Sequence, residues 1–548
     1  MQTEVSFLAD HVRYGLKLNP WLGAGNFLEH AYAVNANRDR QIIFSDKPCE
    51  ALGERLGALS IARLRDVCGR YAAFYFAGGV RPMDPVAVYV AEGVQYLIQY
   101  VALTSLGAIP ILTNGSMDPA VATRHFARTS AVALVTDRQH LARLLPHLVE
   151  TPPKGTHCLE DIANVDPADL PAWYPFKHDH DDPVMVTHTS GTTGVPKAVV
   201  LQHGRWFYGI RHLLGLDPAP GADRYLSSLP ASHNASIAYS IHAILNGAEL
   251  MIMEDRSGRA VANAIAKFQP ATIVSFPQTY VQLAGLDDTE LDFRSVTTWI
   301  NSGDAAHEAH IRRLVAHGYH YRAQQRIEGS QFVDGLGSSE LGHSSFRIVH
   351  TPYTDSYDRC VGVPQSWVEA AVLDEFGEPT PLGQVGRLGV RSASVTTGYW
   401  NDSLTTYSSR LHGYWLTGDL AYRDHLGCYY HLDRMSDVVP TSQGPLYSLQ
   451  TEELVLKHQP GLADCTIIGV TDRGASELVQ APVLLAVPRN GHALDSAALL
   501  REVNELQALH GRPPLARASA VSQDDIPVGV TGKVLKRQLR DQLSGRAA

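Results

Sequence analysis

The sequence predicts an α/β protein: a large N-terminal domain of two doubly wound α/β subdomains plus a β-rich lobe, followed by a small α+β domain. Three observations support this class. Short apolar runs alternate with helical spacing in the first half, closely spaced strands begin at about Val361, and the last hundred or so residues return to mixed helix and strand. A chain of 548 residues also exceeds what one hydrophobic core usually supports, so several packed units are expected.

Two series of apolar runs define the predicted strands of the first half. Helical spacing flanks each run, and this alternation favours parallel sheets with helices on both faces. The first series covers 85–91, 108–113 and 131–136, and the second covers 184–189, 248–253 and 271–276. The Pro- and Asp-rich passage 165–182 between them predicts a connecting loop. Its KHDHDD run (177–182) contains metal-ligand residue types, but consecutive placement favours a solvated linker.

The later part of the chain shows different periodicities. Predicted strands at 368–373, 386–390 and 413–432 are separated by tight turns, which indicates a smaller β-rich unit. Near the C-terminus, Leu535, Leu539 and Leu543 recur at i, i+4 and i+8, the spacing of one helix face.

Composition narrows the classes of protein. The formal charge of -10 and the pI near 6.2 argue against a general nucleic-acid or anionic-membrane binder. The opening residues lack the pattern of a signal peptide, and no apolar run reaches the roughly 20 residues that span a bilayer. Six widely spaced cysteines fit reduced thiols in a cytoplasmic protein rather than disulfides or a zinc site.

A Gly- and Thr-rich segment at 187–197, THTSGTTGVPK, follows a predicted strand. Its two glycines allow a tight backbone turn that presents amide hydrogens. Hydroxyl side chains and Lys197 add donors that suit a polyphosphate. The segment is not a Walker A loop, because Pro196 precedes the lysine and Ala198 follows it. On its own it predicts a phosphate contact.

This segment resembles the signature loop of the ANL superfamily of adenylate-forming enzymes, which comprises acyl-CoA synthetases, peptide-synthetase adenylation domains and luciferases. Six further landmarks resemble those of the family and follow in its order. They are LPASH (229–233), SGDA (302–305), LGSSE (336–340), WLTGD (415–419), DRMSD (433–437) and TGK (531–533). The resemblance therefore extends across most of the chain.

The resemblance implies ATP-dependent adenylation of a small acid, with Mg²⁺ and release of pyrophosphate. It gives Lys533 the catalytic contact with the acid and the α-phosphate, Glu340 the Mg²⁺, and His233 the wall of the acyl pocket. The implied ATP-binding residues are Thr189, Ser190, Gly191, Thr192, Thr193, Gly194, Lys197, Gly303, Asp304, Gly337, Ser338, Ser339, Asp419 and Arg434. Catalysis of this kind rests on positioning and on fixed positive groups.

The resemblance also implies two domains that rotate between half-reactions. An N-terminal domain (1–433) would hold ATP and the acid, and a mobile C-terminal lid (434–548) would carry Lys533. Ser436 and Asp437 occupy the hinge of the family. Such rotation is a hinge-type switch.

Several positions depart from the family pattern. Leu336 replaces the Tyr that stacks on adenine, and Asp433 replaces a glycine before the hinge arginine. The segment 438–444 departs furthest, with Pro440 where relatives have Lys or Asn and Gln443 where they have Gly. In the family this segment lines the pantetheine tunnel, and proline stiffens it and removes a donor. Thioester formation is therefore less firmly predicted than adenylation.

The sequence leaves the acceptor open. The family favours a thiol of CoA or of a carrier protein. An amine is an alternative, including the route in which a small inorganic oxyanion such as nitrite is adenylated and passed to an aromatic amine. A nucleotide-binding descendant without turnover and a phosphotransferase are weaker alternatives, and the second predicts ADP rather than AMP.

The acid itself is only coarsely predicted. Pocket residues are expected within 233–239, 299–304 and 335–337. The polar Asn234, Asn301 and Asp304 favour a small or aromatic, polar substrate over a long fatty chain.

Overall fold

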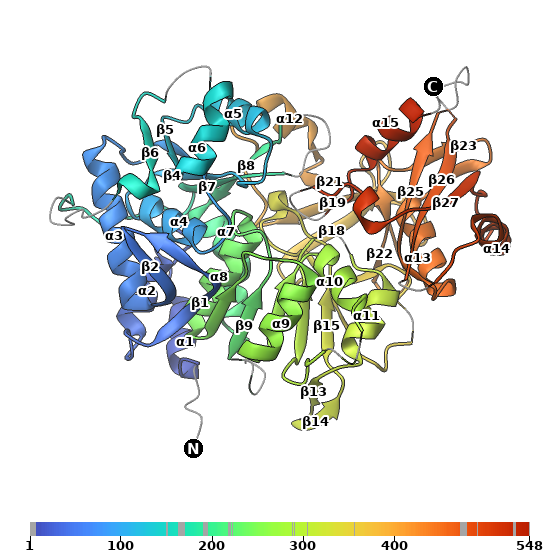
Figure 1. Ribbon diagram of the computed structural model, residues 1–548, viewed down its shortest axis with the longest axis horizontal. Helices are drawn as coiled ribbons and strands as arrows, with labels where there is room; N and C mark the ends of the chain where they lie inside the picture. Colours follow the sequence, from blue (N-terminus) through green and yellow to red (C-terminus); the bar gives the residue numbers. More distant parts are fainter. Residues whose placement is uncertain are drawn as a thin grey trace.

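The computed structural model describes residues 7–148, 152–162, 170–189, 195–216, 221, 223–287, 289, 291–303, 305–355, 357–471, 479–489, 492–529 and 533–546. It shows a large mixed α/β part and a smaller C-terminal part, drawn in orange to red at the right of Figure 1.

A six-stranded sheet forms the first subdomain. Its order is β6-β5-β3-β4-β7-β8, parallel except for the antiparallel pair β7 and β8. The strands are β3 (Pro85–Tyr89), β4 (Ile109–Leu112), β5 (Ala133–Thr136), β6 (Thr156–Cys158), β7 (Pro183–His188) and β8 (Ala198–Gln202). Its helices are α3 (Ile61–Ala77), α4 (Gln95–Ser105), α5 (Pro119–Arg128) and α6 (Arg138–Leu144). The predicted strands at 85–91, 108–113, 131–136 and 184–189 are confirmed within two residues at either end.

The second subdomain is the parallel part of a 14-stranded sheet, with the order β15-β12-β11-β9-β10-β1 and β2 antiparallel at its edge. Its strands are β1 (Gln41–Ala51), β2 (Glu54–Ser60), β9 (Arg224–Ser227), β10 (Glu249–Ile252), β11 (Thr272–Ser275), β12 (Thr298–Asn301) and β15 (Gln331–Asp334). The connecting helices are α8 (Asn234–Asn246), α9 (Gly258–Phe268), α10 (Pro277–Ala284) and α11 (Glu308–Val315), and a hairpin of β13 (Tyr319–Arg322) and β14 (Gln325–Glu328) projects from it.

A shared helical layer joins the two subdomains. One apolar cluster runs from β3 through α3, α4 and α7 (His203–Leu213) to α8 and β10, with Tyr71, Tyr100 and Trp206 fully buried in it. The N-terminal helices α1 (Asp10–Leu18) and α2 (Phe27–Val34) pack against α8. Because both sheets bury one face in this layer, they form one body.

The β-rich lobe continues the second sheet. Beyond β15 the order runs antiparallel through β16, β17, β22, β21, β19 and β18, with β20 paired to β21. The strands are β16 (Phe346–His350), β17 (Cys360–Pro364), β18 (Val368–Leu373), β19 (Gly386–Ser392), β20 (Arg410–Leu411), β21 (Tyr414–Arg423) and β22 (Tyr429–Arg434), with the short helix α12 (Ser403–Ser408). The lobe matches its prediction in strands but shares hydrogen bonds with the α/β sheet, which periodicity alone does not reveal.

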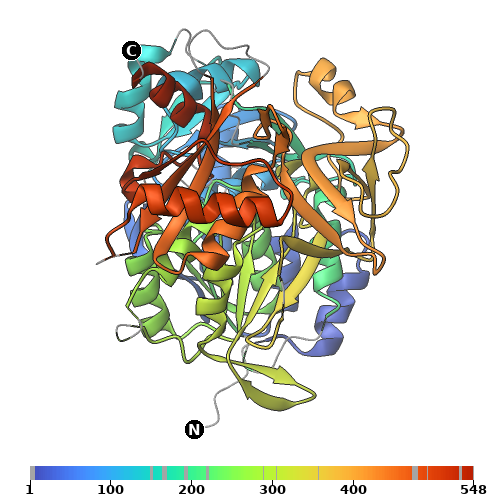
Figure 2. The same cartoon turned by 90° about the vertical axis from the view of Figure 1, so that its right-hand side faces the viewer.

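The C-terminal part has its own core. A three-stranded sheet packs against α13 and α14 around Val455, Ile467, Leu484 and Val503. The elements are β23 (Val439–Thr441), β24 (Gly444–Leu446), α13 (Ser448–His458), β25 (Leu462–Val470), β26 (Ala481–Pro488), α14 (Ser496–Leu509), β27 (Arg517–Ala520) and α15 (Lys536–Arg546). Figure 2 shows this part lying in front of the larger one. The predicted final helix is confirmed as α15, which buries Leu539.

The run 177–182 is largely exposed, as the sequence analysis expects, with one exception. His178 is buried rather than solvated: its Nε2 lies 2.9 Å from the carbonyl oxygen of Thr104, and its ring stacks on His203. The imidazole fills the space beside Gly25, a packing that the polar neighbours in the sequence conceal.

The cysteines agree with the sequence analysis. All six are free, and four of them are buried. Within the described ranges, no group of three or more metal-ligating side chains converges, and no helix has the length and hydropathy needed to cross a membrane.

Candidate functional site

The carboxyl ends of several parallel strands open onto one cavity. Residues that directly follow β7, β11, β12 and β15 all line it, namely Thr189, Phe276, Ser302 and Gly335. Open α/β sheets place their ligands at this edge. The cavity has a volume of about 670 Å³ and lies between the large part and the C-terminal part.

Most of the described residues that the family resemblance selects meet at this cavity. Its wall includes Thr189, Lys197, His233, Gly303, Gly337, Ser338, Ser339, Glu340, Arg434, Ser436, Asp437 and Lys533. Ser190, Gly191, Thr192, Thr193, Gly194 and Asp304 lie outside the described residues. Asp419 is not part of the wall, but the neighbouring Gly418 and Arg434 are.

Glu340 lies in a short 3₁₀ turn, Ser339–Leu341. One oxygen of its carboxylate accepts a hydrogen bond from the Tyr399 hydroxyl at 2.9 Å, while Lys197 lies 5.0 Å from the centre of the Tyr399 ring. Burial and the Glu340 carboxylate raise the pKa of Tyr399, so this hydroxyl stays protonated and donates. Tyr399 thus contacts both Lys197 and the Glu340 carboxylate beside the end of β7.

Asp419 and Arg434 face each other across the antiparallel pair β21 and β22. The Arg434 Nε lies 3.0 Å from the Asp419 carboxylate, which is 3% exposed, and the His431 Nε2 lies 3.4 Å from it. Because two side chains of the neighbouring strand β22 fix the carboxylate, it is preorganised for further donors.

His233 caps the N-terminus of α8, with Nδ1 accepting from the Ala235 amide at 3.1 Å. This bond leaves Nε2 to carry the proton of the neutral ring. Burial, together with the positive field of Lys533 and other groups, lowers the pKa of His233 to about 3. The ring is therefore a neutral donor at physiological pH. Its T-shaped contact with the Phe276 ring, at 5.0 Å between centroids, helps to fix its orientation.

Lys533 reaches the cavity from the C-terminal part. Its carbonyl accepts from the Gly529 amide at 2.8 Å, and the flanking Val528 and Val534 form a bridge. The backbone is thereby fixed next to residues 530–532, which lie outside the described ranges. The side chain shares the cavity with Thr189, Lys197 and Glu340.

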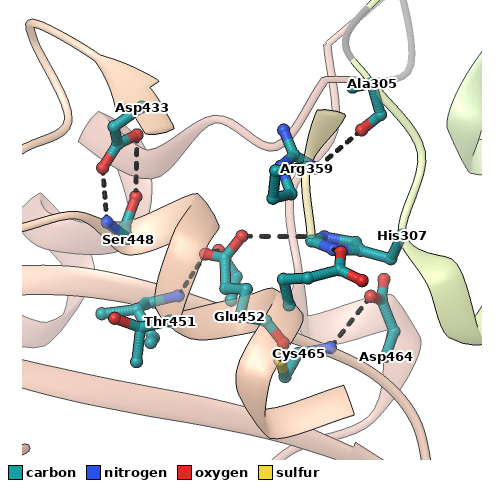
Figure 3. Close-up of polar contacts among 12 residues, drawn as sticks. Ala305, His307, Arg359, Asp433, Ser448, Thr451, Glu452, Asp464 and Cys465 are labelled. Atoms are coloured by element: carbon teal, nitrogen blue, oxygen red, sulfur yellow. Dashed lines mark hydrogen bonds and ion pairs between the residues drawn. The ribbon is translucent and has the colours of Figure 1, made fainter. Parts of the chain in front are cut away.

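A buried polar junction connects the two parts beside the cavity (Figure 3). The His307 Nδ1 lies 2.7 Å from the Glu453 carboxylate, and His307 Nε2 lies 3.9 Å from Glu452. Lys536 pairs with Glu452 at 2.9 Å. Although burial opposes ionisation, the His307 hydrogen bond holds the pKa of Glu453 below its ordinary value.

The turn after β22 connects the two parts covalently. Ser436 and Asp437 lie in this turn, and Asp437 is 3.5 Å from Arg540 of α15. The preceding Asp433 is buried and accepts from the backbone and hydroxyl of Ser448, the first residue of α13 (Figure 3). Asp433, which departs from the family pattern, therefore anchors α13, the first helix after the turn.

Sequence reasoning missed several residues of the cavity. They are Tyr399, which holds Glu340, His307 of the junction, and His343 on the wall beyond Gly342. Glu453, the partner of His307 behind the wall, was missed as well. None of them belongs to one of the recognised landmarks, and each comes to the site through tertiary packing.

The family model "AMP-binding enzyme" matches residues 33–400. The chain belongs to this family. A match of that length covers both α/β subdomains and the lobe up to Trp400, and it agrees with the ANL superfamily to which the landmarks point.

Among curated relatives of this AMP-binding enzyme, 3-aminoavenalumate diazotase of Streptomyces sp is 42% identical over 542 residues, covering 95% of this chain and 96% of the relative. The 3-amino-2-hydroxy-4-methoxybenzoate diazotase of Streptomyces cremeus is 25% identical over 560 residues, covering 95% and 96%. The solved anthranilate CoA ligase AuaEII in complex with anthranoyl-AMP shares the fold, with a TM-score of 0.79, 20% identity and coverage of 98% and 100%. The protein is therefore an enzyme of the AMP-forming ligase type.

Proposed function

We propose that this enzyme activates nitrite with ATP and uses the resulting nitrosyl adenylate to diazotise the amine of an amino-substituted aromatic acid. The observation that carries the proposal is the 42% identity, over 95% of the chain, to 3-aminoavenalumate diazotase. A second relative is a diazotase named for an aminobenzoate. These relatives favour the amine acceptor over the thiol acceptor that the family resemblance alone favours.

The reaction balances in three steps. An oxygen of nitrite attacks the α-phosphorus of ATP, the bond to the β-phosphate breaks, and pyrophosphate leaves. The amine nitrogen then attacks the nitrosyl nitrogen, the N–O bond to AMP breaks, and one proton leaves. The N-nitroso product takes up a proton and loses water. One nitrite, one amine and one ATP thus give one diazonium group, AMP, pyrophosphate and water.

The residues of the cavity suit the first step. The ammonium of Lys533 would stabilise charge at the α-phosphate, assisted by the Ser339 hydroxyl, while Thr189, Lys197 and residues 190–194 would hold the departing phosphates. Asp419 and Arg434 would hold the ribose, and Gly303, Gly337 and Ser338 would border the adenine. Asp304 is assigned to the same border on resemblance alone.

Mg²⁺ fits the phosphate end of the cavity. Glu340 offers an oxygen beyond the one bound by Tyr399, and a carboxylate with phosphate oxygens suits this ion. Glu340 would hold Mg²⁺, which supplies charge neutralisation for the phosphates when bound.

The segment 438–444 supports a nonthiol acceptor. It contains β23 and the first residue of β24, which form a short hairpin in which Pro440 pairs with Pro445. The Pro440 carbonyl also accepts from the Gln480 amide at 2.7 Å, which ties the hairpin to the start of β26. A stiff, tethered hairpin with two prolines is a poor wall for a tunnel that must open for pantetheine.

We divide the chain at residues 433 and 434, with Ser436 and Asp437 as the hinge. The separate cores of the two parts support this division. The need for ATP and the six free thiols support a cytoplasmic location.

Pyrophosphate release tests the proposal. Wild type with ATP and Mg²⁺ should release pyrophosphate on addition of nitrite, and further addition of an aminoaryl acid should give a diazonium that couples to a naphthol as a coloured azo product. ¹⁵N-nitrite should label one nitrogen of that product. Release that depends on the aromatic acid without nitrite, with an acyl-CoA product when CoA is added, would instead identify an acid–thiol ligase.

A further inference from the structure

Diazotisation poses a question of orientation that acid activation does not. In an acid-activating enzyme the carboxylate reacts at the α-phosphate, whereas here the amine must reach the adenylate. The carboxylate of an aminoaryl acid then lies away from the phosphates and needs a partner of its own, because a buried, unpaired carboxylate is costly.

Helix α8 runs along the wall of the cavity, and its N-terminus lies at the end where Lys533 enters. Its N-cap His233 lies within the field of Lys533, and Ala235, Ala238 and Tyr239 follow along the cavity wall. The His343 ring packs on Gly209 of α7, in the helical layer between the two sheets, whereas Lys533 enters the cavity from the C-terminal part. The two residues therefore approach the cavity from different sides, and His343 marks its far end.

His343 is the cationic group suited to that far end. The basic residues on the described cavity wall are His233, His307, His310, His343, Lys197, Arg434, Lys533 and Lys536. His233, Lys197, Arg434 and Lys533 belong to the nucleotide end, while His307 and Lys536 belong to the polar junction, where the His310 Nε2 lies 2.8 Å from the Ala463 carbonyl oxygen. His343 belongs to neither group of contacts and lies between Gly342 and Ser344 on the wall.

The packing around His343 fixes its ring. A side chain at Gly209 of α7 would come within 2.8 Å of the imidazole, so the glycine makes room for it. The Trp367 ring lies 6.2 Å from it and in turn contacts the His212 ring in a tilted arrangement at 4.3 Å. The ring is held by surrounding elements, and no ion pair to it is found among the described residues.

We infer that His343 binds the carboxylate of the aromatic substrate at the far end of the cavity, so that the substrate lies amine-first toward Lys533. This inference rests on the proposed function. The orientation is opposite to that of an acid whose own carboxylate is adenylated, and His343 becomes the residue that selects for aromatic amines with a carboxylate.

Binding of the carboxylate should take up a proton. The His343 Nδ1 lies 3.3 Å from the Ser344 carbonyl oxygen, so a neutral ring would donate there and present Nε2 as an acceptor. A carboxylate requires a donor, hence the imidazolium. Burial, with a smaller contribution from His212 of α7, lowers the pKa of His343 in the free protein. His242 of α8 is the other titratable neighbour, and Lys17 and Arg13 lie beyond these two histidines. Substrate binding should therefore weaken as pH rises.

The experiment compares His343→Gln with the control His212→Gln, which changes a neighbouring histidine outside the cavity wall. The substrates are an aminoaryl acid that the wild type converts and the same amine without its carboxylate. His343→Gln should raise the KM for the acid at least tenfold and leave the KM for the carboxylate-free amine and the nitrite-dependent release of pyrophosphate within about threefold. The wild-type KM for the acid should rise, by up to tenfold per pH unit, between the pKa of His343 in the free enzyme and its higher pKa in the complex, and this dependence should vanish in His343→Gln.

Two results would overturn the inference. One is an equal rise in KM for both substrates, which indicates lost packing. The other is an unchanged KM for the acid with its pH dependence intact. Failure of the proposed function has a separate signature, since pyrophosphate release would then not depend on nitrite in any variant. His343→Asn, which keeps a donor near Nδ1, serves if the glutamine variant does not fold.

Discussion

The two ends of the cavity are built differently. The nucleotide end consists of loops at the carboxyl ends of strands, and its residues belong to sequence landmarks with glycines, hydroxyls and fixed charges. The far end consists of the side of α8 and the segment after Gly342, with Gly209 of α7 packed behind His343, and none of these carries a landmark. The difference indicates that one end serves the adenylation chemistry common to the family and the other serves the individual substrate.

Removal of the Lys533 ammonium should give the largest effect. It should slow the formation of the adenylate and therefore also the half-reaction that consumes it. Lys533→Ala is expected to lower the nitrite-dependent rate of pyrophosphate release by about 10²–10³, the usual loss for one preorganised charge at a transition state. The KM for ATP should change by less than about threefold. A coupled pyrophosphate assay measures both quantities.

Arg537→Ala provides the matched control, because this cation lies four residues along, on an exposed position of α15. It should retain the wild-type rate. An equal loss of rate in both variants would show that the positive charge of this C-terminal region matters, rather than the position of Lys533.

Filling the far end should separate the two half-reactions. Ala238 lies on the cavity wall and is 6% exposed, so Ala238→Trp would occupy space meant for the aromatic substrate. The KM for the amine is expected to rise about 10- to 100-fold, from an overpacking cost of roughly 1–3 kcal/mol. Pyrophosphate release with nitrite alone should stay within about threefold. Tyr239→Phe, which keeps the neighbouring ring, is the conservative control, and a parallel loss of nitrite activation in Ala238→Trp would contradict the separation.

A change at Asp419 should affect the nucleotide end more mildly. Asp419→Asn keeps the shape of the side chain but removes the charge that Arg434 faces at 3.0 Å. The KM for ATP should rise about tenfold, because a hydrogen bond to a carboxylate contributes roughly 1.5–3 kcal/mol and the amide retains part of it. The KM for the amine should not change. Asp424→Asn, in the turn of the same hairpin, is the control, and a rise in the amine KM alone would exclude the ribose role.

The sequence predicted the nucleotide end and most of the fold because both depend on local patterns. Apolar runs gave β3, β4, β5, β7, β10 and β11, since buried parallel strands are continuous in hydrophobicity. The buried His178 was mispredicted because polar neighbours outweighed a tertiary stack on His203. His343 could not be predicted, since its place depends on Gly209 and Trp367, which lie more than twenty residues away on either side. The cap that Asp433 gives to α13 also requires the folded turn.

The smallest effect on rate is expected where the two parts meet, at Glu453. Its carboxylate is buried between the His307 Nδ1 at 2.7 Å and the Glu308 amide at 2.9 Å. Glu453→Gln should lower the free energy of unfolding at pH 7 by about 2 kcal/mol while the rate stays within about threefold, because the amide retains one acceptor but loses the charge. Since the pKa of Glu453 is below its ordinary value in the folded protein, its contribution is complete above that ordinary value and is lost as pH falls through the lower, folded one. Urea unfolding should therefore show a difference between wild type and variant that shrinks on acidification from pH 7 toward pH 3.

The exposed Glu502 of α14 provides the control, for which Glu502→Gln should cost less than about 0.5 kcal/mol at either pH. A difference for Glu453→Gln that grows on acidification would mean that the carboxyl is protonated in the folded enzyme and that His307 does not hold the two parts together by charge.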